Sequence, residues 1–163
     1  MDIQTFLFED DGFIPNNPTL PVLLYRQAVQ EPISVERIFN QNLWLNSWTN
    51  GIFSYHHYHS TTHEVLGVKE GFATVKIGGK QGEELQVHAG DIIVLPAGTG
   101  HMNVDSSADF TVVGAYPNGM SYDVQRGIDG ERPDVLVAIK NVPIPITDPL
   151  YGEGGPLTKY WKD

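Results

Sequence analysis

Residues 51–71 read GIFSYHHYHSTTHEVLGVKEG, and residues 90–103 read GDIIVLPAGTGHMN. Both stretches consist of short apolar or alternating runs interrupted by glycine and proline, a pattern typical of short β-strands joined by tight turns. The pattern continues through residue 116, without the regular alternation of strands and helices that a parallel sheet requires. We therefore expect an all-β sandwich or barrel with minor short helices. Its strands are expected at residues 52–59, 64–69, 72–77, 83–88, 91–95, 101–105 and 110–116.

The first stretch carries a cluster of candidate metal ligands. Side chains alternate between the two faces of a strand, so His57 and His59 project to one side while His56 and Tyr58 face the other. The polar turn that follows lets Glu64, at the start of the next expected strand, face back toward the histidine pair. Two imidazoles and one carboxylate form a site suited to a divalent transition metal.

His101, in the second stretch, is the expected fourth ligand. It follows the sequence PAGTG at residues 96–100, whose glycines let the backbone bend sharply. The chain contains no cysteine, which excludes disulfides and restricts the metal ligands to nitrogen and oxygen.

These two stretches resemble the two sequence motifs of the cupin family. The first motif has a glycine, a His-x-His pair, a glutamate and a second glycine, and every spacing is met by Gly51, His57, His59, Glu64 and Gly71. The second motif is matched by Gly90, Pro96, Gly98 and His101, but its asparagine departs from the pattern, because Asn103 stands two residues after the histidine instead of four. The resemblance implies a jelly-roll barrel, also called a double-stranded β-helix, that binds one metal ion.

Three further segments are similar to the YjlB-like group of bacterial cupins: residues 14–25, 57–67 and 148–152. With them the resemblance extends over nearly the whole chain. It implies a fold and a metal site but no particular substrate, and the likeness to cupins in general implies a homodimer.

The length of 163 residues indicates a single domain, 1–163. We expect an N-terminal extension at 1–50 that packs on the barrel, a barrel core at 51–116 that contains both motifs, and a C-terminal extension at 117–163. Short helices are expected at 22–30, 34–42 and 133–141. Residues 1–21 and the tail that begins at residue 148 are expected to be irregular or extended.

Charge and hydropathy exclude some classes of partner. The formal net charge is −10, from 10 basic and 20 acidic residues, and no Lys/Arg run is present to neutralise phosphates, so we expect no nucleic-acid binding. The first residues lack the basic and apolar regions of a signal peptide, and no apolar stretch approaches membrane-spanning length. We therefore expect a cytoplasmic protein that does not bind membranes.

Tyr55 and His63 are the candidate catalytic residues. Alternation places the Tyr55 side chain on the same strand face as His57 and His59, toward the barrel interior. In a small barrel the residues that fill the interior also form the wall of the pocket, so Tyr55 could offer its hydroxyl to a ligand. His63 directly precedes Glu64 and can act as a proton-transfer group. For His56 and His63 the competing interpretation is a surface position, because alternation directs both away from the metal.

The expected function is that of a metal-dependent enzyme, of the dioxygenase or isomerase type, acting on a small organic molecule. Its cofactor would be one divalent transition metal ion, Fe, Mn, Ni or Zn, with coordination positions left open for a ligand. A sugar phosphate is disfavoured because Lys69 is the only basic residue in either motif. The alternative is a non-catalytic module in which the metal anchors a small-molecule ligand or stabilises the barrel.

Overall fold

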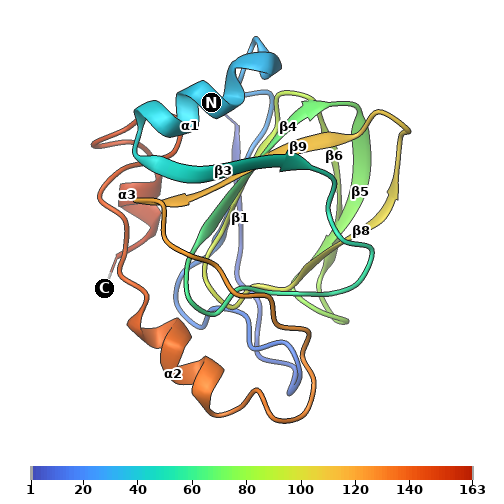
Figure 1. The fold of residues 1–163 in the computed structure, drawn as a ribbon, viewed down its shortest axis with the longest axis vertical. Helices are drawn as coiled ribbons and strands as arrows, with labels where there is room; N and C mark the ends of the chain where they lie inside the picture. Colours follow the sequence, from blue (N-terminus) through green and yellow to red (C-terminus); the bar gives the residue numbers. More distant parts are fainter. Residues whose placement is uncertain (1, 163) are drawn as a thin grey trace.

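The strands form two antiparallel sheets that together make a barrel (Figure 1). The computed structural model describes residues 2–162. The larger sheet has the strand order β1-β2-β7-β4-β9-β3, and the smaller has the order β6-β5-β8. The strands are β1 Ile3–Phe6, β2 Val22–Tyr25, β3 Trp44–Asn50, β4 Glu64–Glu70, β5 Phe72–Ile77, β6 Glu83–His88, β7 Ile92–Leu95, β8 His101–Ser106 and β9 Thr111–Pro117. This architecture confirms the expected all-β jelly-roll barrel.

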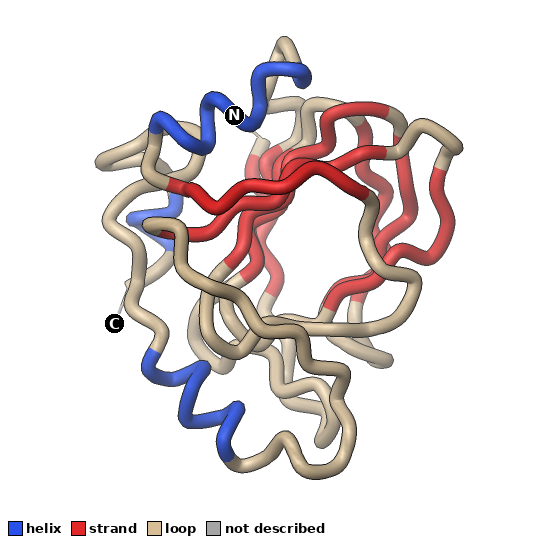
Figure 2. The backbone as a smooth tube through the Cα atoms, viewed as in Figure 1, coloured by secondary structure: helices blue, strands red, loops and turns tan. Residues whose placement is uncertain are grey.

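Helices lie on the outside of the barrel (Figure 2). A 3₁₀ turn, η1 Pro32–Ser34, leads into α1 Val35–Gln41, and α2 Asp134–Asn141 and α3 Leu157–Tyr160 follow the last strand. None of the helices between residues 2 and 162 is long and apolar enough to cross a membrane.

The central strands of the larger sheet are buried on both faces, which explains their continuous apolar runs. In β4, Leu66 and Val68 point into the barrel and join one core cluster, whereas Val65 points outward and joins a second. The second cluster fills the space between the sheet and the flanking terminal segments and includes Phe39 of α1 and Trp161 after α3. The fold therefore has one core inside the barrel and one outside the larger sheet. A smaller third cluster packs helix α2 on the barrel and consists of Ile14, Tyr58, Ala97, Val135 and Ile139.

Helix α1 packs directly on β4 at Gly67. A Cβ atom at this position would lie 2.5 Å from Val35 Cγ2 and 2.8 Å from Phe39 Cζ. The absence of a side chain at Gly67 thus permits the close approach of the helix that covers the outer face of the sheet.

Several sequence expectations for the elements are confirmed. Strands β4 to β9 and helices α1 and α2 lie where the sequence predicts them, with ends shifted by at most one residue. The two glycines at 78 and 79 begin the loop between β5 and β6, and both have positive φ angles, 95° and 86°. The antiparallel pairing of Ile77 with Glu83 closes this hairpin.

Other expectations are wrong. Residues 22–25 form strand β2 instead of a helix, because a short apolar run is compatible with either structure and the pairing with β7 decides it. Residues 3–6 form β1 although an irregular segment is expected there, and residues 157–160 form α3 within the expected extended tail. Residues 44–50 form β3, while the expected strand at 52–59 is a loop that contains only isolated bridges at His57 and Tyr58. The first 50 residues therefore supply β1, β2 and β3 of the larger sheet.

Candidate metal centre and its cavity

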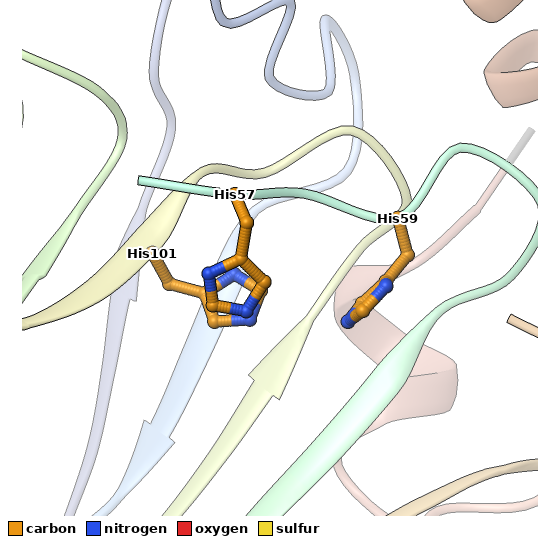
Figure 3. A group of neighbouring side chains, drawn as sticks. All are labelled: His57, His59 and His101. Carbon is orange, nitrogen blue, oxygen red and sulfur yellow. The ribbon is translucent and has the colours of Figure 1, made fainter. Parts of the chain in front are cut away.

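A backbone bridge positions two of the predicted ligands. The His57 N–H donates to the His101 carbonyl at 3.2 Å, and the His101 N–H donates to the His57 carbonyl at 2.9 Å. This antiparallel bridge brings the two rings to a centroid separation of 4.1 Å. His59, two residues further on, lies on the same side, with ring centroids 5.7 Å from His57 and 5.6 Å from His101. Figure 3 shows the three rings directed toward the same region.

Hydrogen bonds fix which nitrogen of each ring faces this region. Nδ1 of His57 lies 3.2 Å from the Tyr55 carbonyl, and Nδ1 of His101 lies 3.0 Å from the Thr99 carbonyl. Nδ1 of His59 contacts the Asp123 carbonyl. A carbonyl oxygen only accepts, so each Nδ1 carries a hydrogen, and Nε2 is the nitrogen of each ring that can bind a metal. One ligand nitrogen from each ring lies within 4.8 Å of the other two, as metal-binding histidines require.

Glu64 completes the group from the start of β4. Its side chain is only 2% exposed, and Oε1 lies 3.3 Å from Nε2 of both His59 and His101. This oxygen has no hydrogen-bond partner, whereas Oε2 accepts a hydrogen bond from the Tyr116 hydroxyl at 2.6 Å. A buried carboxylate oxygen that faces imidazole nitrogens is costly unless a proton or a metal ion lies between them. The donor set of three nitrogens and one oxygen therefore fits a divalent metal ion.

The electrostatics of the group also favour a cation. Burial lowers the pKa of His57 to about 3, and the neighbouring His101 acts in the same direction. Burial opposes charge on His59 as well, but the Glu64 carboxylate outweighs it and raises the pKa of His59 to about 9. Burial favours the neutral form of Glu64, yet His59 and His101 together hold its pKa below the ordinary value. Without a metal ion, a proton on His59 therefore balances the charge of the buried carboxylate, and a bound metal ion would take over that role.

The four residues lie at a cavity of about 280 Å³ inside the barrel. Its remaining lining is mostly apolar and aromatic, with few hydroxyl and amide groups: Trp48, Thr49, Asn50, Gly51, Ile52, Phe53, Leu66, Tyr116, Tyr122 and Val124. Glu64 is the only carboxylate in the lining, which contains no Lys or Arg. A small, largely apolar molecule is the ligand that suits such a surface.

The structure does not bring Tyr55 or His63 into this lining. Tyr55 stacks on Phe53 at 5.0 Å, and the Arg126 guanidinium lies 3.9 Å from the centre of its ring. Residues 52–56 are not a strand, so strict alternation, on which the prediction for Tyr55 rests, does not apply there. His56 is half-buried and also lies outside the lining.

His63 has its two ring nitrogens engaged within the protein. The Ala97 N–H donates to Nδ1 at 2.8 Å, and Nε2 lies 3.2 Å from the Pro143 carbonyl. The ring also packs against Trp161, with centroids 4.7 Å apart, and the residue is 1% exposed. The surface position considered for His63 is therefore wrong, and its ring connects the turn at Ala97 to Pro143 and Trp161 of the C-terminal segment.

Sequence reasoning missed three aromatic residues and one carboxylate around the candidate metal centre. Tyr116 bonds to Glu64, Trp48 donates to the Tyr116 hydroxyl at 2.7 Å, and Tyr122 stacks on Tyr116 at 4.8 Å. Asp123 holds the loop after His59 through Ser60 and Thr61. A glycine within the apolar run TVVGAY at 111–116 was the one available signal, because glycine in a strand often marks a close approach of other groups. No comparable signal marked the other residues.

Comparison with known proteins agrees with the architecture. Residues 48–113 match the cupin domain family. The chain is 43% identical to the Bacillus subtilis protein YjlB over 160 residues, which cover 98% of this chain and 97% of the relative. The chain belongs to the cupin family. The relative is described as an uncharacterized protein, so the match brings no activity with it.

This cupin is also similar to solved structures at low sequence identity. Acireductone dioxygenase from Bacillus anthracis, with a cadmium ion in its active centre, is 18% identical, with a TM-score of 0.38 and coverage of 54% of this chain and 58% of the other. A variant of oxalate decarboxylase from Bacillus subtilis is 18% identical, with a TM-score of 0.41 and coverage of 78% and 33%. The cupin spans less than two thirds of each of these two chains. Both similarities are too distant to indicate a shared activity.

Proposed function

We propose that this cupin is a metal-dependent enzyme that acts on a small organic molecule. Its cofactor would be one divalent transition metal ion, Fe, Mn, Ni or Zn, held by His57, His59, Glu64 and His101. The observation that carries the proposal is the buried, unpartnered Glu64 Oε1, which faces imidazole nitrogens at an internal cavity. An ion bound there would supply Lewis-acid chemistry or, if it is redox-active, oxygen-activating chemistry.

Of the two reaction types that the sequence suggests, the cavity favours a dioxygenase. Isomerisation needs a group that removes a proton from the substrate and returns it. The three histidines in the lining are assigned to the metal, Glu64 is the only carboxylate, and Lys and Arg are absent from it. The Tyr116 hydroxyl already donates to Glu64, which leaves the weakly acidic phenol of Tyr122 as the one other titratable group in the lining. A dioxygenation inserts both atoms of O₂ into the substrate and requires no external reductant. The chain then has to bind the substrate, orient it and exclude water, which an apolar wall does.

The lining also limits the substrate class. An anion such as a sugar phosphate would find no Lys or Arg among the lining residues, whereas rings and alkyl groups would contact Trp48, Phe53 and Leu66. The cavity volume of about 280 Å³ lies at the lower end for ligand sites. We therefore propose a small uncharged substrate with an aromatic or branched apolar part and one oxygen group that reaches the metal.

An oxygen-uptake screen tests this proposal. Protein loaded with Fe²⁺ or Mn²⁺ is mixed with small phenols, diketones and other apolar molecules that carry oxygen groups, and O₂ consumption is recorded beside product analysis. We expect O₂ uptake that requires the metal and disappears in His101→Ala. Conversion that proceeds equally well without O₂ would instead indicate an isomerase. Metal-dependent ligand binding without any conversion would support the non-catalytic alternative.

A homodimer is proposed on the resemblance to cupins alone. Light scattering coupled to size-exclusion chromatography tests it, and a mass of 18.1 kDa would identify a monomer.

A further inference from the structure

The pairing of β4 with β9 places Tyr116 opposite Glu64. Val65 pairs with Ala115 in this antiparallel ladder, so the next step along it sets residue 116 beside residue 64. Both side chains point to the inner face, where the Tyr116 hydroxyl donates to Glu64 Oε2 at 2.6 Å. Both residues are buried, which makes this a strong charge-assisted hydrogen bond.

Trp48 fixes the direction of that hydrogen bond. Its indole Nε1–H lies 2.7 Å from the Tyr116 hydroxyl oxygen, and an indole nitrogen can only donate. The Tyr116 oxygen therefore accepts from Trp48, and its own hydrogen is left for Glu64. Gly114, which pairs with Trp48 in the sheet, makes room for the indole, because a Cβ atom there would lie 2.3 Å from Trp48 Cε2.

We infer that Tyr116 is a positioning residue that holds Glu64 so that only Oε1 binds the metal. A carboxylate that binds a metal through both oxygens must turn both toward the ion, which would draw Oε2 away from Tyr116. That rotation would lengthen and bend the buried hydrogen bond from Tyr116, which costs free energy because its hydroxyl has no other acceptor among the described residues. Binding through one oxygen would leave more coordination positions of a bound ion open to a ligand in the cavity. The inference rests on the metal centre of the proposed function, although it does not depend on the reaction.

Tyr25 offers a matched control elsewhere in the fold. Its hydroxyl donates to Asp148 Oδ2 at 2.5 Å, and both residues are fully buried. Tyr25 and Asp148 are absent from the cavity lining. Tyr25→Phe therefore removes the same kind of buried tyrosine–carboxylate bond as Tyr116→Phe, but without a metal ligand as the acceptor.

The experiment compares metal affinity in the wild type, Tyr116→Phe and Tyr25→Phe. The Kd for Zn²⁺ is measured in competition with a chromophoric chelator, and the visible absorption spectrum of Co²⁺-loaded protein reports the coordination number. We expect Tyr116→Phe to raise the Zn²⁺ Kd roughly 10- to 100-fold, as is usual when a group that orients a metal ligand is removed. We also expect its Co²⁺ bands to weaken, because a second carboxylate oxygen raises the coordination number. Tyr25→Phe should lower the unfolding temperature while the Zn²⁺ Kd and the Co²⁺ spectrum stay unchanged.

Each other outcome has a defined meaning. An unchanged Kd and Co²⁺ spectrum in Tyr116→Phe, beside a wild type that binds both metals, would overturn the role of Tyr116 and leave the proposed function standing. A wild type that binds neither metal would overturn both. If Tyr116→Phe does not fold, Trp48→Phe decides, because it removes the donor that orients the hydroxyl. It should weaken Zn²⁺ binding in the same direction but less, and an unchanged Kd would refute the inference.

Discussion

At the residue scale, Tyr122 takes the place that alternation assigned to Tyr55. Its ring lines the cavity, stacks on Tyr116 and meets the His59 ring edge-on at 5.4 Å. The residue is 45% exposed, so we expect its hydroxyl to be within reach of a substrate that enters the cavity. The loop that carries it is held by Asp123, whose carboxylate accepts from the Ser60 N–H at 2.7 Å.

Tyr122→Phe should therefore weaken substrate binding. Loss of one hydrogen bond to a bound molecule costs about 1 kcal/mol, which corresponds to roughly a fivefold rise in KM for the substrate found by the oxygen-uptake screen. Tyr55→Phe serves as the control and should leave KM nearly unchanged, because Tyr55 lies outside the lining. Metal content must be equal in the two variants. A larger effect of Tyr55→Phe would show that the substrate enters past the Phe53–Tyr55 stack instead.

The clustering of the four predicted ligands could be predicted from the sequence because their spacing lies within two short segments, and the structure brings all four side chains together. Tyr116 could not be predicted, because its contact with Glu64 depends on the register between β4 and β9, which residue types alone do not specify. Asp123 acts through a loop whose path no local pattern indicates. Local motifs thus specified the ligands, and long-range pairing specified what orients them.

At the element scale, the difference between local sequence patterns and long-range pairing explains which strands were predicted. Strands β5 and β6 are half-buried and alternate in polarity, as in Val75 and Ile77 against Thr74 and Lys76, so the sequence indicates both their type and their inner face. Strand β2 is buried on both faces and has no periodicity, which led to its prediction as part of a helix. Strand β3 has an irregular register between Leu45 and Trp48 and several exposed polar residues. Its sequence therefore shows neither the alternation of a half-buried strand nor the continuous apolar run of a fully buried one.

Asp148 connects the C-terminal segment to β2, and its removal should destabilise the fold. Oδ2 accepts from the Tyr25 hydroxyl and from the Leu157 N–H, while Oδ1 accepts from the N–H groups of Leu150 and Tyr151. In Asp148→Asn, an amide NH₂ would have to face two of these donors. We expect the free energy of unfolding to fall by about 3 kcal/mol, measured by urea denaturation with a chelator present. Asp105→Asn, at an exposed position, should change it by less than about 0.5 kcal/mol. Equal effects of the two variants would mean that the buried network contributes little.

At the scale of the whole molecule, the two larger hydrophobic cores should keep the barrel folded without a metal. One fills the barrel and the other lies between the larger sheet and the terminal segments, and the three ligand histidines and Glu64 belong to neither. A metal that binds only the folded state adds about 3 kcal/mol when its free concentration is a hundredfold above its Kd. Chelation should therefore lower the unfolding temperature by roughly 5–10 °C for a domain of this size. Far-UV circular dichroism should still report a β-rich protein, whereas a chelated protein with an unfolded spectrum would show that the metal centre is required for folding.

Metal content per chain tests the central claim, that His57, His59, Glu64 and His101 hold one divalent ion, most directly. Wild-type protein, the double variant His57→Ala/His101→Ala and the control His88→Ala are purified without added metal and analysed by plasma mass spectrometry. His88 is exposed at the end of β6 and outside the cavity lining, so its removal should have no effect. We predict close to one metal ion per chain in the wild type and in His88→Ala, and almost none in the double variant. A folded double variant that keeps a full complement of metal would contradict the account.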